Sequence, residues 1–200
     1  MVIAWSAIAN ASGYVVEYAT NNSFTNAQSI LTTGTSTTLT GLAANTLYYV
    51  RVAATGTGAY TDSDWSDTAS FKTDAIRLAP PTLGNVTATG SDRISLSWNA
   101  LPNASGYVIQ YSTDSSFSTD IITLPGISAS RTEATITGLN DETTYYFRIM
   151  AIGTGSYSNS DYSAVESATT DPKLSPAGSL DAFWSEYGLS GINDELAMPV

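Results

Sequence analysis

The chain has 200 residues, and its 7 basic and 18 acidic side chains give a net charge of −11 at neutral pH. This charge disfavours nucleic acid and anionic lipid as partners, because the few cations are scattered and form no basic patch. Histidine and cysteine are both absent. Their absence excludes Ser-His-Asp triads, thiol nucleophiles and metal sites built on imidazole or thiolate.

The composition favours strands and turns, since Thr, Ser, Tyr, Val and Gly are abundant and Lys and Glu are scarce. Only 12% of residues are charged, a composition common in secreted β-proteins. The longest apolar runs cover a few residues, so we expect neither a membrane span nor a signal peptide. A length of 200 residues suits two domains of the commonest size.

An internal repeat organises the chain. The segment NASGY occurs at residues 10–14 and again at 103–107, an offset of 93 residues. After an insertion of four residues in the second copy, further matches continue at an offset of 97. The matched pairs include Trp5/Trp98, Tyr18/Tyr111, Phe24/Phe117, Thr46/Thr143, Tyr48/Tyr145 and Arg51/Arg148. Such self-similarity indicates two copies of one domain.

Apolar and polar residues alternate along several segments of the second copy. The alternation runs through 94–98, 107–111 and 145–151. A period of two places one set of side chains on a buried face and the other in water. Turn signals separate these segments, at 101–103, 113–116, 124–126, 138–142 and 153–159. Short strands at this spacing predict an all-β sandwich or barrel.

A longer pattern, L-x-x-x-T-x-Y-x-x-R followed by Ile or Val, occurs at 42–52 and 139–149. Together with the preceding Trp and Tyr of each copy, it resembles the core signature of fibronectin type III domains. The resemblance covers residues 2–73 and 80–171. It implies two tandem seven-stranded, immunoglobulin-like sandwiches.

The resemblance also assigns roles to the matched aromatic residues. It implies that Trp5 and Trp98 lie in the two cores, next to Tyr14 and Tyr107, which are also expected to be buried. It implies that Tyr48 and Tyr145 are tyrosine corners, whose hydroxyls bond to backbone a few residues upstream. The Pro that the family usually has two residues after the Leu is absent in both copies.

We expect a first domain at 1–74, a linker at 75–79, a second domain at 80–172 and an acidic tail at 173–200. The second copy has an apolar segment at 80–88 that supplies a first strand, whereas only four residues precede Trp5. The first domain is therefore expected to lack its first strand, and the native chain to extend upstream of Met1. The exposed edge that results favours self-association or pairing with another strand.

Each copy has a Gly-rich loop with aromatic residues, which are Tyr60 and Trp65 in the first copy and Tyr157 and Tyr162 in the second. In the family that the chain resembles, this loop often binds partners. Two interpretations stay open. The rings form a contact surface for a protein or glycan, or Trp65 and Tyr162 pack at the start of the final strand.

The densest acidic group, Asp62, Asp64 and Asp67, lies beside Trp65. It lacks the Gly turn and terminal Glu of an EF-hand loop, and the second copy keeps only Asp161. We therefore expect a solvated loop, with no catalytic residue, metal or cofactor.

Within the tail, Leu180, Phe183, Trp184 and Tyr187 recur at helical spacing, and Gly188 follows as a stop signal. This pattern predicts a short amphipathic helix. It either packs on the second domain or docks another module or chain, so Phe183, Trp184 and Tyr187 are further candidate contact residues.

The resemblance implies a non-catalytic, extracellular or cell-surface module that acts as a spacer or protein-interaction unit in a larger modular protein. We expect a bacterial source. Two other functions stay open: an adhesive module that binds glycan or protein, and an accessory domain pair of a secreted polysaccharide-degrading enzyme. The partner is expected to be an unidentified protein or glycan.

Overall fold

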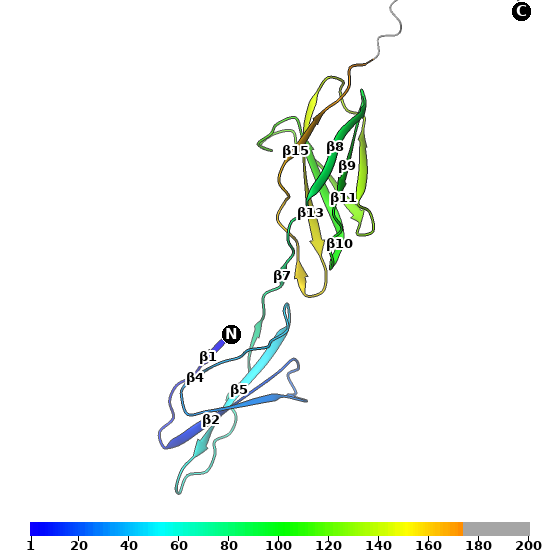
Figure 1. The fold of residues 1–200 in the computed structure, drawn as a ribbon. Coiled ribbons are helices and arrows are strands. Elements are labelled where there is room, and N and C mark those ends of the chain that lie inside the picture. The colour runs from blue at the N-terminus through cyan, green and yellow to red at the C-terminus, as the bar shows by residue number, and fades with distance from the viewer. Residues whose placement is uncertain (174–200) are drawn as a thin grey trace, which may run out of the picture.

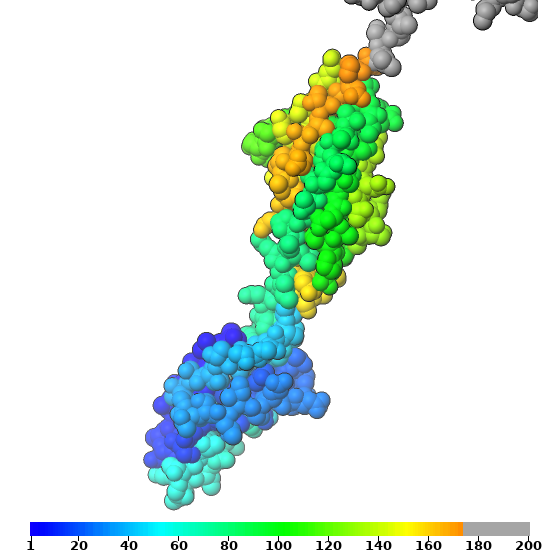
Figure 2. All heavy atoms as spheres, in the orientation of Figure 1, coloured from blue at the N-terminus to red at the C-terminus, as the bar shows by residue number. Residues whose placement is uncertain are grey.

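The computed structural model describes residues 1–173, which form two β-sandwich domains joined end to end (Figure 1). Every element in this range is a strand, so the described part of the chain is all-β, as expected. The two domains form separate lobes with a narrow junction between them (Figure 2). The helix expected in the tail, with Phe183, Trp184 and Tyr187, lies outside the described residues.

The first domain contains one two-stranded and one four-stranded antiparallel sheet. In the smaller sheet, β1 (Val2–Ala4) pairs with β4 (Ser36–Thr38). The larger sheet has the order β3-β2-β5-β6, with β2 (Ala11–Ala19), β3 (Gln28–Thr32), β5 (Leu47–Gly56) and β6 (Ala69–Lys72).

The second domain has the same arrangement with one strand more. Its larger sheet has the order β11-β10-β13-β15, with β10 (Ala104–Ser112), β11 (Ile122–Ser128), β13 (Thr144–Gly153) and β15 (Glu166–Thr169). Its smaller sheet has the order β12-β9-β8, with β8 (Leu83–Gly90), β9 (Arg93–Trp98) and β12 (Glu133–Thr137). Among residues 1–173 no strand of the first domain corresponds to β8.

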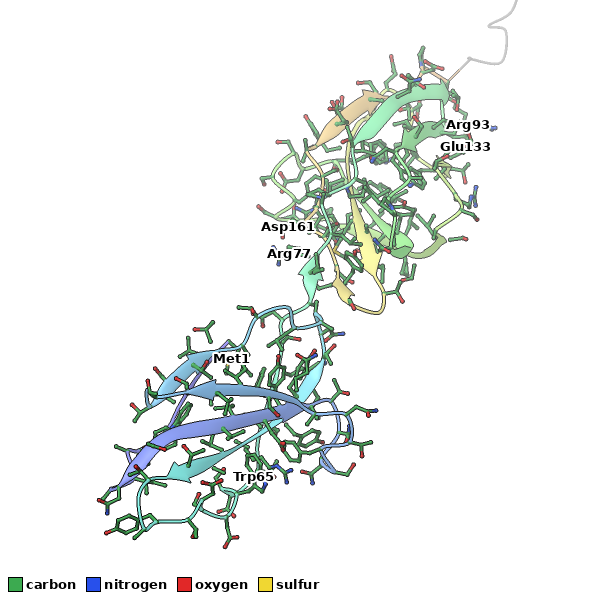
Figure 3. The ribbon with its side chains drawn as sticks, turned by 60° about the horizontal axis from the view of Figure 1, so that its bottom comes forward. Met1, Trp65, Arg77, Arg93, Glu133 and Asp161 are labelled. Atoms are coloured by element: carbon green, nitrogen blue, oxygen red, sulfur yellow. The ribbon has the colours of Figure 1, made fainter. Side chains whose placement is uncertain are left out.

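The segment between the domains forms strand β7 (Ile76–Arg77), which pairs in parallel with β14 (Tyr157–Ser158) of the second domain. The next residue, Leu78, is buried in the core of the second domain. Arg77 donates two hydrogen bonds to Asp161, at 2.9 and 2.7 Å, and both side chains lie at the junction (Figure 3). The segment expected as a linker is thus held along much of its length by the second domain.

The core of the second domain follows the predicted alternation. Its hydrophobic side chains with 0% exposure come from the inward positions of β9, β10 and β13, and they are Ile94, Tyr107, Ile109, Phe147, Ile149 and Ala151. Both tyrosine corners are confirmed, because Tyr48 Oη accepts from the N–H of Ala43 at 3.0 Å and Tyr145 Oη from that of Asn140 at 3.1 Å. Each corner ties a strand to the turn that precedes it.

The expectation that Trp5 is buried is wrong, whereas Tyr14, Trp98 and Tyr107 are buried as expected. Trp98 is 4% exposed and pairs with Leu83 of β8, which covers it. Trp5 makes the same edge-to-face contact with its tyrosine, at a ring separation of 5.3 Å compared with 5.5 Å for Trp98. It stays half-buried because no strand among residues 1–173 takes the place of β8 beside it.

This difference predicts unequal effects of two matched substitutions. We expect Trp98→Ala to lower the free energy of unfolding of the second domain by about 3 to 5 kcal/mol, as for other buried aromatic truncations. Trp5→Ala should cost the first domain at most about half as much, since part of its ring is already in water. Hydrogen exchange in increasing denaturant measures each domain separately, and equal losses would contradict this assignment of burial.

The turn between β10 and β11 is held by the carboxylate of Asp114. It accepts from the hydroxyl of Ser116 at 2.7 Å and from the N–H groups of Ser116, Ser118 and Thr119 at 2.9, 2.8 and 3.2 Å. These bonds, first of all the one from the Ser116 hydroxyl, lower the pKa of Asp114 from 3.8 to about 2. The first domain has the neutral Asn21 at the corresponding position, where it also accepts from nearby donors.

Because the folded-state pKa of Asp114 is depressed, its contribution to stability is complete above about pH 4 and disappears as the pH falls through about 2. We expect its carboxyl carbon to titrate with a midpoint of about 2 in an NMR experiment. Asp114→Asn should make the free energy of unfolding of the second domain less dependent on pH between about pH 2 and pH 4. A midpoint near 4 would show that the turn does not favour the charged form.

Candidate functional site: stacked arginines and an exposed loop

Each domain carries an arginine between two aromatic rings on the outer face of its larger sheet. Strand alternation turns Tyr48 and Val50 of β5 inward and Arg51 outward. The Arg51 guanidinium carbon lies 4.1 Å from the ring centre of Phe24 and 4.4 Å from that of Trp65. Arg148 of β13 lies at the same distances, 4.1 and 4.4 Å, from Phe117 and Tyr162. These distances are those of cation–π interactions.

A polar side chain on the neighbouring strand fixes each guanidinium in its plane. Arg51 donates from Nε and Nη2 to Glu17 Oε2 at 3.0 and 2.7 Å. Arg148 donates in the same way to Gln110 Oε1 at 2.9 and 2.7 Å. The stack of the first domain thus contains an ion pair, and that of the second does not.

The segment that carries Trp65 is fastened along β5 by two serines. The Ser63 and Ser66 hydroxyls accept from the N–H groups of Ala54 and Val52, at 2.9 and 3.0 Å. Their own N–H groups donate to the carbonyls of the same two residues, at 3.0 and 2.8 Å. Trp65 lies between these anchor points, so its indole is held over Arg51. In the second domain, Ser160 and Ser163 make the corresponding bonds along β13.

The loop after β5 turns back tightly at Gly56. A Cβ atom at this residue would clash with the carbonyl oxygen of Tyr60, so only glycine fits. Asp62 closes the loop by accepting from the N–H of Gly56 at 2.9 Å. The loop is therefore pinned at both ends, and the Tyr60 side chain between them is 60% exposed.

The structure separates the four aromatic residues predicted for the two loops. The loop after β5 lies at the end of the first domain remote from the second domain, and Trp65 lies toward that end (Figures 1 and 3). The loop after β13 lies at the junction, where the Gly155 carbonyl accepts from Asn45 Nδ2 at 2.8 Å. Tyr157 is half-buried there in β14, and Tyr162 covers Arg148.

The acidic residues of the first loop do not gather into a cluster. Within residues 1–173 there is no group of three or more Asp or Glu side chains placed to hold a metal ion. The same residues contain no helix with the length and apolar character to cross a membrane.

Two stretches of the chain match the Fibronectin type III domain family: residues 1–71 and 79–166. The chain belongs to this family. A similar human protein, the netrin receptor DCC, is 36% identical over 127 residues, which is 60% of this chain and 9% of the receptor. The chain thus spans less than a tenth of that relative. The expected bacterial source stays a prediction.

Among solved structures, the crystal structure of chicken CNTN1 FN1-FN3 domains is similar to the chain. The match covers 85% of this chain and 59% of that one, at 20% identity and a TM-score of 0.43.

The sequence did not reveal the arginine stacks, although it contained a signal for them. Phe24 and Arg51 recur in the second copy as Phe117 and Arg148. Arg51 also lies at an outward position of a strand that otherwise alternates regularly. A recurring charged residue at such a position, with an aromatic residue in a recurring turn, indicates an outer-face contact that both copies need.

We expect Arg51→Met to release Trp65 from β5 and to lower the stability of the first domain by about 1 to 2 kcal/mol, from the lost cation–π and charged hydrogen-bond contributions. Arg51→Lys should recover only part of this, because an ammonium group does not stack as a planar guanidinium does. Denaturation and the indole NMR signal of Trp65 measure the two effects. Arg148→Met is the matched control, which should leave that signal unchanged.

Proposed function

We propose that this chain is a non-catalytic, extracellular protein-interaction module of a larger modular protein, and that the loop after β5 contacts the partner. Membership of the fibronectin type III family supports the general role, as does the similarity to a human protein whose name describes a receptor. The absence of His and Cys from the sequence is consistent with a role that requires no imidazole or thiol chemistry.

The exposure of Tyr60 on a pinned loop is the observation that carries this proposal. Interfaces are enriched in tyrosine, because its ring supplies a large contact area and its hydroxyl a hydrogen bond. The bonds of Gly56 to Asp62 and of Ser63 to Ala54 hold the loop in place before any partner arrives. A preorganised loop loses less conformational entropy on binding than a flexible one.

Charge indicates the chemistry of the partner. The loop carries Asp62, Asp64 and Asp67, all exposed, and the whole chain has a net charge of −11. Complementary potentials speed association and disfavour partners of like charge. We therefore propose a protein partner with a basic surface around a cleft that receives the Tyr60 ring.

Binding to a panel of extracellular proteins, displayed as multimers, tests this function. We expect at least one partner whose affinity falls about tenfold or more in Tyr60→Ala, as for an interface hot spot. The rate at which this partner associates with the chain should fall as salt is added, because salt screens the attraction between opposite charges. Leu31→Ala, a change at another exposed apolar side chain, is the control and should have no effect. The proposal would be contradicted if the chain bound glycans alone, or if Tyr60→Ala left the affinity for every protein partner unchanged.

A further inference from the structure

The larger sheet of each domain ends at a strand whose outer edge pairs with no other strand of residues 1–173. This strand is β3 in the first domain and β11 in the second. In the second domain the preceding segment forms β7 and β8, and β8 joins the smaller sheet. The edge of β11 thus stays open although that segment is present, so an open edge at this place is a property of the fold.

The hydrogen bonds of β5 identify the backbone groups that β3 directs to its open edge. Val52 and Ala54 bond to the segment 63–66, on the side of β5 away from β2. Because successive residues of a strand direct their backbone groups to opposite edges, these bonds fix the alternation in β2 and β3 through the pairing registers. The residues of β3 that bond to β2 are then Gln28, Ile30 and Thr32. Ser29 and Leu31 direct their N–H and C=O groups to the open edge.

The two edge strands differ in the features that prevent pairing with a further strand. Strand β11 carries Pro125, which has no N–H, at an irregularity between the pairs of Tyr107 and Ile109. Gly126 follows with a φ of 77°. Strand β3 has the sequence Gln-Ser-Ile-Leu-Thr and pairs with β2 without irregularity. It lacks the Pro, Lys and bulge that protect natural edge strands.

Charge distinguishes the two edges as well. Residues 18–50, which include β3 and β4, contain no charged side chain, although the whole chain has a net charge of −11. Glu17 and Arg51, which flank this stretch, form an ion pair at 2.7 Å. The corresponding residues 111–147 carry six charged side chains, which are Asp114, Asp120, Arg131, Glu133, Asp141 and Glu142. A second copy of this acidic chain therefore meets no like charge on the strand when it approaches β3.

An exposed apolar side chain lies on the same edge. Leu31 is 77% exposed, the largest fraction among the exposed large apolar side chains of the described residues. It lies opposite Val15, on the outer face of the sheet. An open backbone edge with an apolar and uncharged surface is the combination that leads to pairing between the edges of two molecules.

We infer that β3 pairs in antiparallel orientation with β3 of a second copy of this chain and so forms a transient homodimer. Antiparallel pairing of a strand with itself is isologous, so the outward N–H and C=O groups of Ser29 and Leu31 find matching groups on the other copy. The register that places Leu31 opposite Leu31 also brings the two apolar side chains into contact. The two four-stranded sheets then join into one continuous sheet.

Self-complementarity and the absence of charge select a second copy as the partner. A strand of five residues buries less than the roughly 1,200 Å² of a standard interface, so the dimer is weak and exchanges with the monomer. Added salt should strengthen it, because salt screens the repulsion between the acidic remainders of the two copies.

Sedimentation velocity of the full chain, at protein concentrations up to about 1 mM, tests this inference. We expect a shift from monomer to dimer that grows with concentration. Leu31→Lys places a charge from each copy at the shared edge and should weaken dimerisation about tenfold or more, whereas the exposed position tolerates the change in the monomer. Ile122→Lys, at a side chain of β11 that is 48% exposed, is the matched control and should leave dimerisation unchanged.

Amide hydrogen exchange provides a second test that requires no variant. The amides of Ser29 and Leu31 should exchange quickly in the dilute chain and more slowly at high concentration, while that of Thr123 in β11 stays the same. The inference would be wrong if the chain stayed monomeric, if both Lys variants had the same effect, or if Ser29 and Leu31 were equally protected at both concentrations. Tyr60→Ala should leave dimerisation unchanged, which separates this test from that of the proposed function.

Discussion

The architecture depends on one constraint, which is that each sheet buries one face against the other sheet. Around the Trp–Tyr contact at 5.3 Å in one domain and 5.5 Å in the other, alternate residues are apolar and face inward. The intervening residues point to the outer face of the sheet, where they can make surface contacts. In β5, Tyr48 and Val50 fill the core, and this places Arg51 on the outer face where it anchors the returning loop.

The alternation predicted from the sequence located the strands of the second domain, and the resemblance to fibronectin type III domains located the tyrosine corners. The burial of Trp5 was mispredicted because burial depends on a neighbouring strand, and no property of Trp5 itself reports whether one is present. The contact between Phe24 and Arg51 could not be predicted from local sequence patterns either, because the two residues are far apart in the sequence. Phe24 and Phe117 both adopt a φ of 54°, which is uncommon for aromatic residues, so sequence preferences do not predict these turns.

The candidate loop was predicted in part. Its position between the last two strands of each domain follows from the resemblance, and the role of Tyr60 as a contact residue stays a prediction. Sequence equivalence nevertheless implied that Tyr60 and Tyr157 share an environment, which they do not. Tyr157 pairs with Ile76 in the segment that precedes β8, and the described residues provide no such segment for Tyr60.

The exposure of Tyr60 and the partial exposure of Trp5 therefore have a common structural origin within the described residues. In the second domain one continuous segment pairs first with Tyr157, through Ile76, and then with Trp98, through Leu83. The counterparts of Tyr157 and Trp98 in the first domain are Tyr60 and Trp5, and the described residues contain no such segment that pairs with either. Burial at both positions is therefore set by one segment that is distant in sequence from the loop, and the loop's own residues do not determine it.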